Sequence, residues 1–269
     1  MGASSSTADT SPEAHERREQ ETLASAALAL PLLRAAFSRS AAGALPDALA
    51  PPRASFRLPG SLPPHFHDLL AALGPAVASL FFAGGAAAGA EGGAGWVPFL
   101  KGFNRCCARV SASRSLALLL RVYAAACAAA GAPCSVHFQP DEGGDEEGKV
   151  AGEIAPEEIA VFLWMCWVMT WSGSAPKAAA GDGGEKSEPV ALLLPDVTHL
   201  VVSALVSAGA VADDESVWGW QISTGGKGVK VQEFTSWVLA TASGLGNCLS
   251  QYVQERLRSL AADSTEVSK

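Results

Sequence analysis

The chain has 269 residues, a net charge of −8 and six cysteines, and 49% of its residues are hydrophobic. This length suits one large domain or two small ones, and the negative charge argues against a nucleic-acid partner, since no basic run is present to neutralise phosphates. Six cysteines without a recognisable secretory signal peptide are typical of reduced thiols in a cytosolic compartment.

The first residues, MGASSST, match the N-myristoylation pattern, in which Gly2 becomes the N-terminus after Met1 is removed and Ser6 follows four residues later. The alternative is a Ser-rich tail without a lipid, and in either case we expect residues 1–12 to be disordered. One myristoyl chain binds membranes only marginally. Any tether through Gly2 is therefore expected to be reversible.

The hydrophobic pattern predicts an all-α chain, because almost no segment must be a strand. Pro31 is expected to kink or break the first helix, and Pro75 to bend the second. Ser111 or Ser113 is a plausible N-cap of the fourth helix, and Gly131 its stop signal. In this half we expect helices over residues 13–37, 65–82, 96–110 and 111–130, with a flexible Gly-rich loop over residues 84–95.

The second half is expected to be helical as well. Its strongest apolar run, Ile159 to Trp171, falls short of the ~20 residues that a helix needs to cross a bilayer, so we expect a buried core helix and no transmembrane span. The elements expected here are an acidic loop over residues 139–152, a helix over 156–171 with Pro156 in its first turn, a linker-like insertion over 172–189, a helix over 192–208, an extended segment near 217–222, and a final helical region over 231–260 with a break at 244–246.

Helices that pair across loops invite comparison with the EF-hand, whose calcium loop needs oxygen ligands at positions 1, 3, 5 and 12, Gly at 6 and an apolar residue at 8 that pairs two loops through a short β-bridge. With Glu158 at position 12, Gly152 falls at 6 and Ile154 at 8, but Lys149 occupies a ligand position. The scaffold positions are kept while the ligands are missing.

Three further frames can be drawn, of which the last is weaker. Glu233 at position 12 puts Val229 at 8, and Pro98 at 12 puts Gly92 at 6. A fourth frame places Gly43 at 6. No frame offers three of the four carboxylate-type positions, so we expect negligible calcium affinity. The frames predict two EF-hand-like lobes, over residues 13–138 and 139–262, followed by a polar tail over 263–269; the alternative is an unrelated helical bundle.

Certain segments resemble the N-terminal half of plant TLDc-domain proteins, which are similar in layout to the myristoylated, mTOR-associated TLDc protein of animals. They are MGASSST, LASAALALPLLRAAF, GWVPFLKGFNRCCARVSASRSL and QEFTSWVLATASGLGNCL. The resemblance implies an EF-hand-like region followed by a β-rich TLDc domain, which is absent from this chain, and we expect either a natural short form or a truncated protein. Pro98 stands where the resembling sequences carry an acidic residue.

Trp164, Trp167 and Trp171 lie at i, i+3 and i+7 and share one helix face. Such stripes usually pack into a core, which is the interpretation we favour. The alternative is a groove for a partner helix or for the protein's own myristoyl chain. Cys106 and Cys107 are expected to be a buried structural pair, the alternative being thiols whose pKa is lowered by nearby arginines.

No nucleophile elbow, P-loop or dinucleotide-binding motif is present, and no pair of acids is placed for general acid–base work. We therefore name no catalytic residue, metal ligand or cofactor. The expectation is a non-catalytic regulatory or adaptor module with protein partners, on cytosolic faces of endolysosomal, vacuolar or plasma membranes, or alternatively in the nucleus or nucleolus. The rival functions are a calcium sensor, and the N-terminal part of a larger TLDc protein in oxidative-stress or nutrient signalling.

Overall fold

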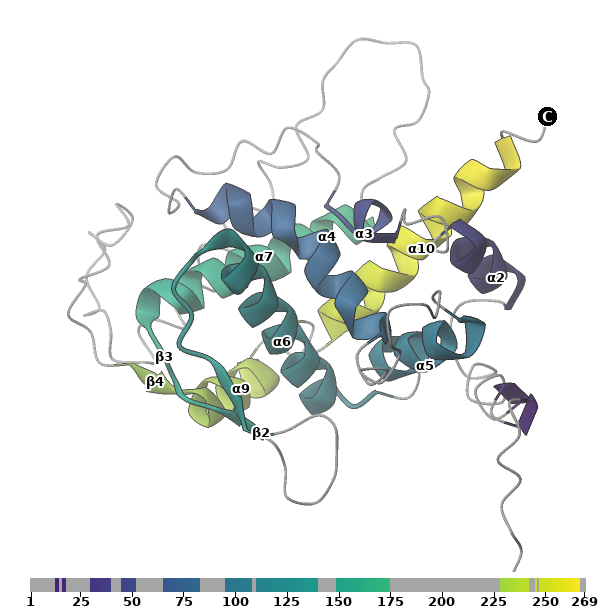
Figure 1. Ribbon diagram of the computed structural model, residues 1–269. Coiled ribbons are helices and arrows are strands. Elements are labelled where there is room, and N and C mark those ends of the chain that lie inside the picture. The colour runs from purple at the N-terminus through teal and green to yellow at the C-terminus, as the bar shows by residue number, and fades with distance from the viewer. Residues whose placement is uncertain are drawn as a thin grey trace, which may run out of the picture.

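The computed structural model describes the chain in segments and is mostly helical there, as predicted (Figure 1). The predicted helix over 192–208, the extended segment near 217–222 and nearly all of the insertion over 172–189 lie outside the described residues. The described segments are residues 13–14, 16–17, 30–39, 45–51, 65–82, 95–107, 110–139, 149–174, 228–241, 245 and 247–266.

Eight helices and four short strands are described. The helices are α2 (Leu30–Arg39), α3 (Leu45–Ala48), α4 (Phe66–Phe82), α5 (Trp96–Cys107), α6 (Ala112–Ala130), α7 (Pro156–Ser174), α9 (Val231–Thr241) and α10 (Cys248–Glu266). The strands are β1 (His137–Gln139), β2 (Lys149–Ala151), β3 (Glu153–Ile154) and β4 (Val229–Lys230). They form two antiparallel pairs, β1 with β2 and β3 with β4.

The local signals fixed several helix ends correctly. The side chain of Ser111 accepts a hydrogen bond from the Arg114 N–H, and Gly131 ends α6 in the left-handed conformation with φ of 64°. Pro156 begins α7, as predicted. Pro31 lies in the first turn of α2, where a missing N–H costs nothing, while Pro75 lies inside a continuous α4.

Two expectations need correction. The loop predicted over residues 139–152 contributes strand β2, whose backbone pairs with β1 in the register Phe138 with Val150. The polar tail predicted from residue 263 begins inside α10, which continues to Glu266. One described helix, α6, is long and apolar enough by length and composition alone to cross a membrane, although half of that stretch is buried inside the protein.

Two glycines let helices of the first half approach closely. A Cβ at Gly74 in α4 would collide with the carbonyl oxygen of Pro46 in α3, and a Cβ at Gly102 in α5 would collide with the backbone of Phe81 in α4. Phe81 and Phe99 stack beside this second crossing, with ring centroids 5.4 Å apart. The glycines therefore set how near α3 and α5 lie to α4.

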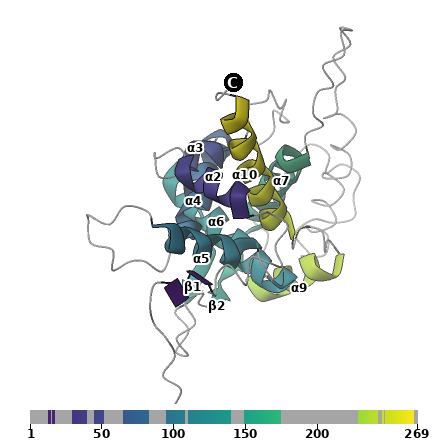
Figure 2. The same cartoon turned by 90° about the vertical axis from the view of Figure 1, so that its right-hand side faces the viewer.

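Helix α10 lies between α2 and α7 and also packs on α5 (Figure 2). Its Tyr252 hydroxyl donates to the Leu49 carbonyl at 2.6 Å, and its Arg256 Nε donates to the Ala48 carbonyl at 2.9 Å. These bonds satisfy carbonyls at the end of α3, where no further helical turn could do so. The last helix thus holds an element from the start of the chain.

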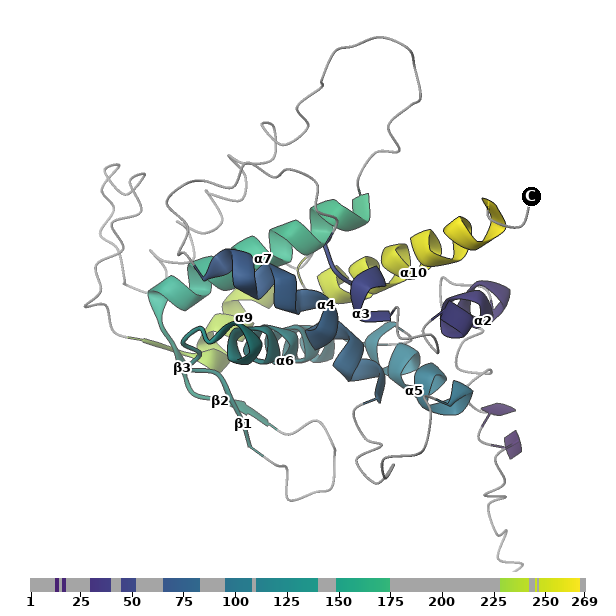
Figure 3. The ribbon, with the colours of Figure 1, turned by 45° about the horizontal axis from the view of Figure 1, so that its top comes forward.

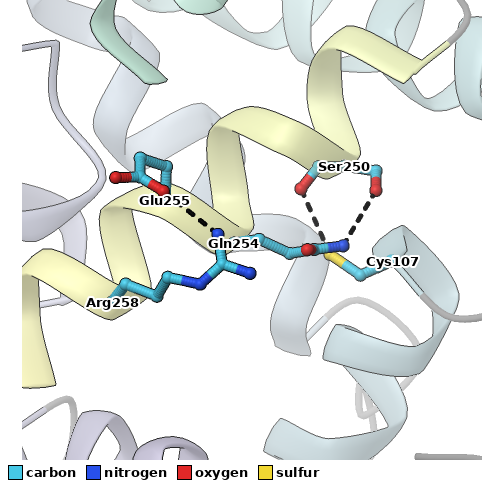
Figure 4. Close-up of polar contacts among 5 residues, drawn as sticks. All are labelled: Cys107, Ser250, Gln254, Glu255 and Arg258. Atoms are coloured by element: carbon cyan, nitrogen blue, oxygen red, sulfur yellow. Dashed lines mark hydrogen bonds and ion pairs between the residues drawn. The ribbon is translucent and has the colours of Figure 1, made fainter. Parts of the chain in front are cut away.

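The contact between α10 and α5 is partly polar (Figure 4). The Cys107 thiol at the end of α5 donates to the Ser250 carbonyl at 3.9 Å, and the side-chain amide of Gln254 donates to the Ser250 hydroxyl at 3.2 Å. Arg258 forms an exposed ion pair with Glu255 one turn along α10, at 3.1 Å. These contacts lie at the edge of one hydrophobic core, which includes buried residues from α2 to α10. The core therefore extends to both sides of residue 138, where the boundary between the two lobes was predicted.

Candidate functional site

The predicted site residues of the second half gather at one junction, where β3 pairs with β4 and the chain enters α7 and α9 (Figure 1 and Figure 3). Gly152, Ile154, Glu158, Val229 and Glu233 all belong to it or to the first turns of those helices. The remaining predicted residues do not join it: Pro98 is exposed in the first turn of α5, while Gly2, Ser6, Gly43 and Gly92 lie outside the described residues.

Strands β3 and β4 form a two-residue antiparallel ladder. Ile154 is the register partner of Val229, and Glu153 is the partner of Lys230. The ladder continues into the helix that follows β4, because the Val231 N–H donates to the Gly152 carbonyl at 3.1 Å. Ile154 is fully buried. The two residues that the loop frames set at position 8 are thus paired with each other.

Gly152 stands where only glycine fits. Its φ of 118° is in the range that side chains disfavour, and a Cβ there would lie 2.5 Å from the Ser135 carbonyl oxygen. The absence of a side chain lets the segment before β1 pass directly over the start of β3. Gly152 therefore brings three parts of the chain together: β2, β3 and the segment around Ser135.

Glu158 is buried and uses both carboxylate oxygens on backbone groups. Oε1 accepts from the Ser135 N–H at 2.6 Å, and Oε2 accepts from the Ala155 N–H at 2.9 Å. The second bond is half of a capping box, in which a glutamate at the third helical position reaches back to the N-cap N–H. A buried carboxylate is costly unless hydrogen-bonded, and here these two donors compensate it.

The remaining predicted ligand positions that the structure describes lie in a strand in the first loop and at the start of a helix in the second. Lys149 and Ala151, at positions 3 and 5, lie in strand β2, where alternate side chains leave on the same face of an extended backbone instead of converging on a point. Glu233, at position 12 of the other loop, is exposed in the first turn of α9. Among the residues that the structure describes, the junction has the glycine and the apolar pair that the loop frames require but no convergent set of oxygens.

A pocket of about 300 Å³ opens beside the junction, between α6, β2 and α9. The hairpin that walls it is fixed on both sides: Arg121 lies over the Phe138 ring at 5.0 Å, and the Gln232 amide donates to the Val150 carbonyl at 3.0 Å. Its lining combines apolar side chains such as Leu120 and Leu239 with hydroxyl and amide groups, and none of the described lining residues is ionisable. The pocket suits an apolar group with a few polar contacts.

Two of the three tryptophans on the predicted face of α7 are part of the core. Trp164 is 0% exposed and Trp167 is 7% exposed, and their rings meet edge to face with centroids 5.3 Å apart. The burial of these two rings favours the core interpretation over an open groove. Trp171 belongs to α7, but its side chain lies outside the described part of the structure.

The structure adds a polar cluster behind Glu158 that sequence reasoning missed. The Cys127 thiol is in hydrogen-bonding contact with both Cys134 and the Tyr123 hydroxyl, and Glu158 is near all three. Burial raises the pKa of the Tyr123 hydroxyl, so that it stays protonated. One signal was available: Cys127 and Cys134 flank Gly131, the glycine that turns the chain back at the end of α6.

The adjacent cysteines at the end of α5 were expected to be a buried pair, and the structure buries only one of them fully. Cys106 is buried and Cys107 is half-buried. Burial, and then the neighbouring Cys106, raise the pKa of the Cys107 thiol, which is the opposite of activation by nearby arginines. Within the described residues, no group of three or more His, Cys, Asp and Glu side chains is placed to hold a metal ion.

Comparison with protein-family models, with curated proteins and with solved structures finds no match for this chain.

Proposed function

We propose that the chain is a regulatory or adaptor module in which α6–α7 and the segment through β4 and α9 belong to an EF-hand-like pair that lacks calcium ligands. The observation that carries the proposal is the pairing of Ile154 with Val229 directly before α7 and α9. Paired EF-hands join their loops through such a bridge, and Gly152 stands at the expected turn.

The state of Glu158 supports a role without calcium. A position-12 glutamate binds the ion with both carboxylate oxygens, but here both accept backbone N–H groups of Ser135 and Ala155. Calcium binding would have to break both bonds and would leave two part-buried donors unpaired, at a cost towards the lower end of about 1–3 kcal/mol each. The junction then acts as a fixed scaffold that presents its surface to a protein partner.

Calorimetry tests this part directly. Titrating the whole chain with Ca²⁺ is expected to give no saturable heat up to millimolar concentration. Heat that saturates at micromolar Ca²⁺ and disappears in Glu158→Gln would contradict the proposal and establish the rival function, a calcium sensor. Glu233→Gln is the matched control, because Glu233 holds the same position in the other loop but is exposed.

The proposal also includes a reversible membrane tether through a myristoyl group on Gly2, as in the TLDc-type proteins that the sequence resembles. Support comes from the MGASSST motif. The cytosolic faces of endolysosomal, vacuolar or plasma membranes are the proposed location, with the nucleus or nucleolus as the alternative. Acting as the N-terminal part of a larger TLDc protein is a second candidate, supported by the same resemblance.

The tether is tested by localising the C-terminally tagged chain beside Gly2→Ala, with Ser4→Ala as a control that keeps both motif residues. Wild type and Ser4→Ala are expected on membranes, and Gly2→Ala is expected to be diffuse. Mass spectrometry of the native N-terminus should show the added acyl chain. An unmodified or acetylated N-terminus would remove the membrane part of the proposal and leave the helical module.

A further inference from the structure

Six cysteines occur in the described part of the chain, and two pairs of them are in side-chain contact. In one pair the Cys127 thiol donates a hydrogen bond to Cys134. In the other, Cys166 and Cys248 are in contact across the packing of α7 and α10. The two pairs differ in their access to solvent, and this difference decides which of them can react.

The backbone holds the first pair in place. At the end of α6 the Ala132 N–H donates to the Cys127 carbonyl at 2.9 Å, and the Gly131 N–H donates to the Ala128 carbonyl at 3.4 Å. These are the two bonds of a Schellman motif, which reverses the chain through a left-handed glycine. Cys134 therefore returns beside Cys127 without a long loop to order.

The two thiols of this pair are unequal. Cys127 is 1% exposed, whereas Cys134 is half-buried and reachable from solvent. The hydrogen bond that the Cys127 thiol donates lowers the pKa of the Cys134 thiol, because it stabilises the Cys134 thiolate. The same bond raises the pKa of the Cys127 thiol, because Cys127 would lose it on giving up its proton. Cys134, the more accessible thiol, is thus the better nucleophile, and the buried Cys127 thiol lies next to it.

We infer that Cys127 and Cys134 form a reversible disulfide site, at which a hydroperoxide such as hydrogen peroxide is the oxidant. The Cys134 thiolate attacks one peroxide oxygen, the O–O bond breaks, and Cys134 becomes a sulfenic acid while hydroxide leaves. The Cys127 sulfur then attacks the sulfenic sulfur, an S–S bond forms, and water leaves with the proton of Cys127. In total two thiols and one hydrogen peroxide give one disulfide and two waters.

The bond would join the last turn of α6 to the segment that carries Ser135. This segment donates to Glu158 and passes over Gly152, so oxidation would tie α6 covalently to the β3–β4 junction. The inference depends on the contact between the two thiols, on the chain reversal that brings them together and on their unequal exposure, with the lowered pKa of Cys134 as support. It holds whether or not the junction belongs to an EF-hand-like adaptor.

Peptide mapping of the native, full-length chain tests the site. After treatment with stoichiometric hydrogen peroxide, alkylation of remaining thiols and trypsin digestion, the peptide Val122–Lys149 is expected to lose the mass of two hydrogen atoms. Dithiothreitol should restore both thiols. Cys166 and Cys248 fall in different tryptic peptides, so that a disulfide between them would appear as a cross-linked pair, which we expect to be absent because both are fully buried.

Two further measurements protect the test against a folding defect. In the untreated wild type, Cys134 is expected to react with iodoacetamide roughly tenfold or more faster than Cys107, because alkylation follows the thiolate fraction. In Cys127→Ser the sulfenic acid on Cys134 has no resolving thiol and is expected to be trapped by dimedone. Oxidation that begins at Cys107 or at the Cys166–Cys248 pair, or a Cys127–Cys134 peptide that keeps both thiols, would overturn the inference.

Discussion

The two oxygens of Glu158 accept hydrogen bonds from Ser135 and Ala155, at 2.6 and 2.9 Å, in a buried position. One bond is local and belongs to the first turn of α7, while the other joins that turn to the segment after α6. A single carboxylate therefore links two parts of the chain. Because the acceptor is the carboxylate of a buried side chain, these are bonds of the stronger kind.

Substituting Glu158→Gln keeps the shape of the side chain but replaces one acceptor oxygen by an NH₂ group. One of the two backbone donors is then left without an acceptor, and we expect the free energy of unfolding to fall by about 2–3 kcal/mol. Urea denaturation measures the change. Glu233→Gln, at the equivalent but exposed position of α9, should change stability by less than about 0.5 kcal/mol; equal effects would contradict the role given to Glu158.

Buried thiols make the protein sensitive to alkaline pH. Burial, with Cys248 second, raises the pKa of the Cys166 thiol well above its ordinary value of 9.0. Below that value both the folded and unfolded chains keep the proton, and above it only the unfolded chain loses it. Stability is therefore retained below about pH 9 and falls as the pH rises further, by about 1.4 kcal/mol per pH unit for each such thiol.

Denaturation between pH 8 and 11 measures this slope in wild type and in Cys166→Ala. The variant is expected to be less stable at every pH, because it leaves a small cavity, but its alkaline slope should be shallower by about 1.4 kcal/mol per pH unit. Leu69→Ala is the control: it removes a fully buried side chain that carries no titratable group, so it should lower stability and leave the slope above pH 9 unchanged.

At the scale of elements, the helices begin and end where local chemistry dictates, and close packing then depends on small residues at crossings. Ser111 and Gly131 cap α6, and Pro156 begins α7. Gly74 and Gly102 let α3 and α5 approach α4 until backbone meets backbone. A helix end is thus decided within one turn of sequence, whereas a crossing is decided by two elements together.

Gly102→Ala places a methyl group against the backbone of Phe81, which cannot move as a flexible side chain would. We expect a loss of about 3 kcal/mol or more, at the upper end of what overpacking costs, although alanine is the better helix former. Gly131→Ala is the matched control: nothing lies within 4 Å of its Cβ and only the positive φ is unfavourable, so its cost should be about 1–2 kcal/mol. Chemical denaturation compares the two, and a Gly102→Ala protein as stable as wild type would refute the α4–α5 contact.

At the scale of the whole molecule, one hydrophobic core runs through both proposed lobes. Helix α10 contacts α2 and α5 from the first half and α7 from the second, and its Tyr252 and Arg256 hold the end of α3. The boundary at residue 138 passes through this core. A chain built in this way gains its stability from contacts between halves as well as within them.

We therefore expect a single cooperative unfolding transition, with tryptophan fluorescence and far-ultraviolet circular dichroism giving the same midpoint. Leu69→Ala in α4 and Leu257→Ala in α10 both remove fully or almost fully buried side chains. Each should lower that one midpoint, in line with a loss of about 2–5 kcal/mol. Two separate transitions, with each variant shifting only one of them, would show that the lobes unfold independently.

The sequence by itself determined what depends on a few neighbouring residues. Helical periodicity predicted the mostly helical chain, and the serine, glycine and proline signals placed the ends of α6 and the start of α7. The loop frames set Ile154 and Val229 at equivalent positions, which the structure joins as register partners. These features follow from backbone sterics and hydrogen bonding within one or two turns, and such effects can be read without knowing the path of the chain.

Only the tertiary structure decided which distant groups meet. The packing of the helices buries the rings of Trp164 and Trp167, and the path of the chain pairs β1 with β2. It also gives Glu158 its hydrogen bond to Ser135 and places Cys134 next to Cys127. A buried tryptophan and an exposed one share the same helical spacing, and a glutamate can face either solvent or two amides. The physical reason is that burial and the choice of partner depend on the packing of elements far apart in sequence, which no local pattern encodes.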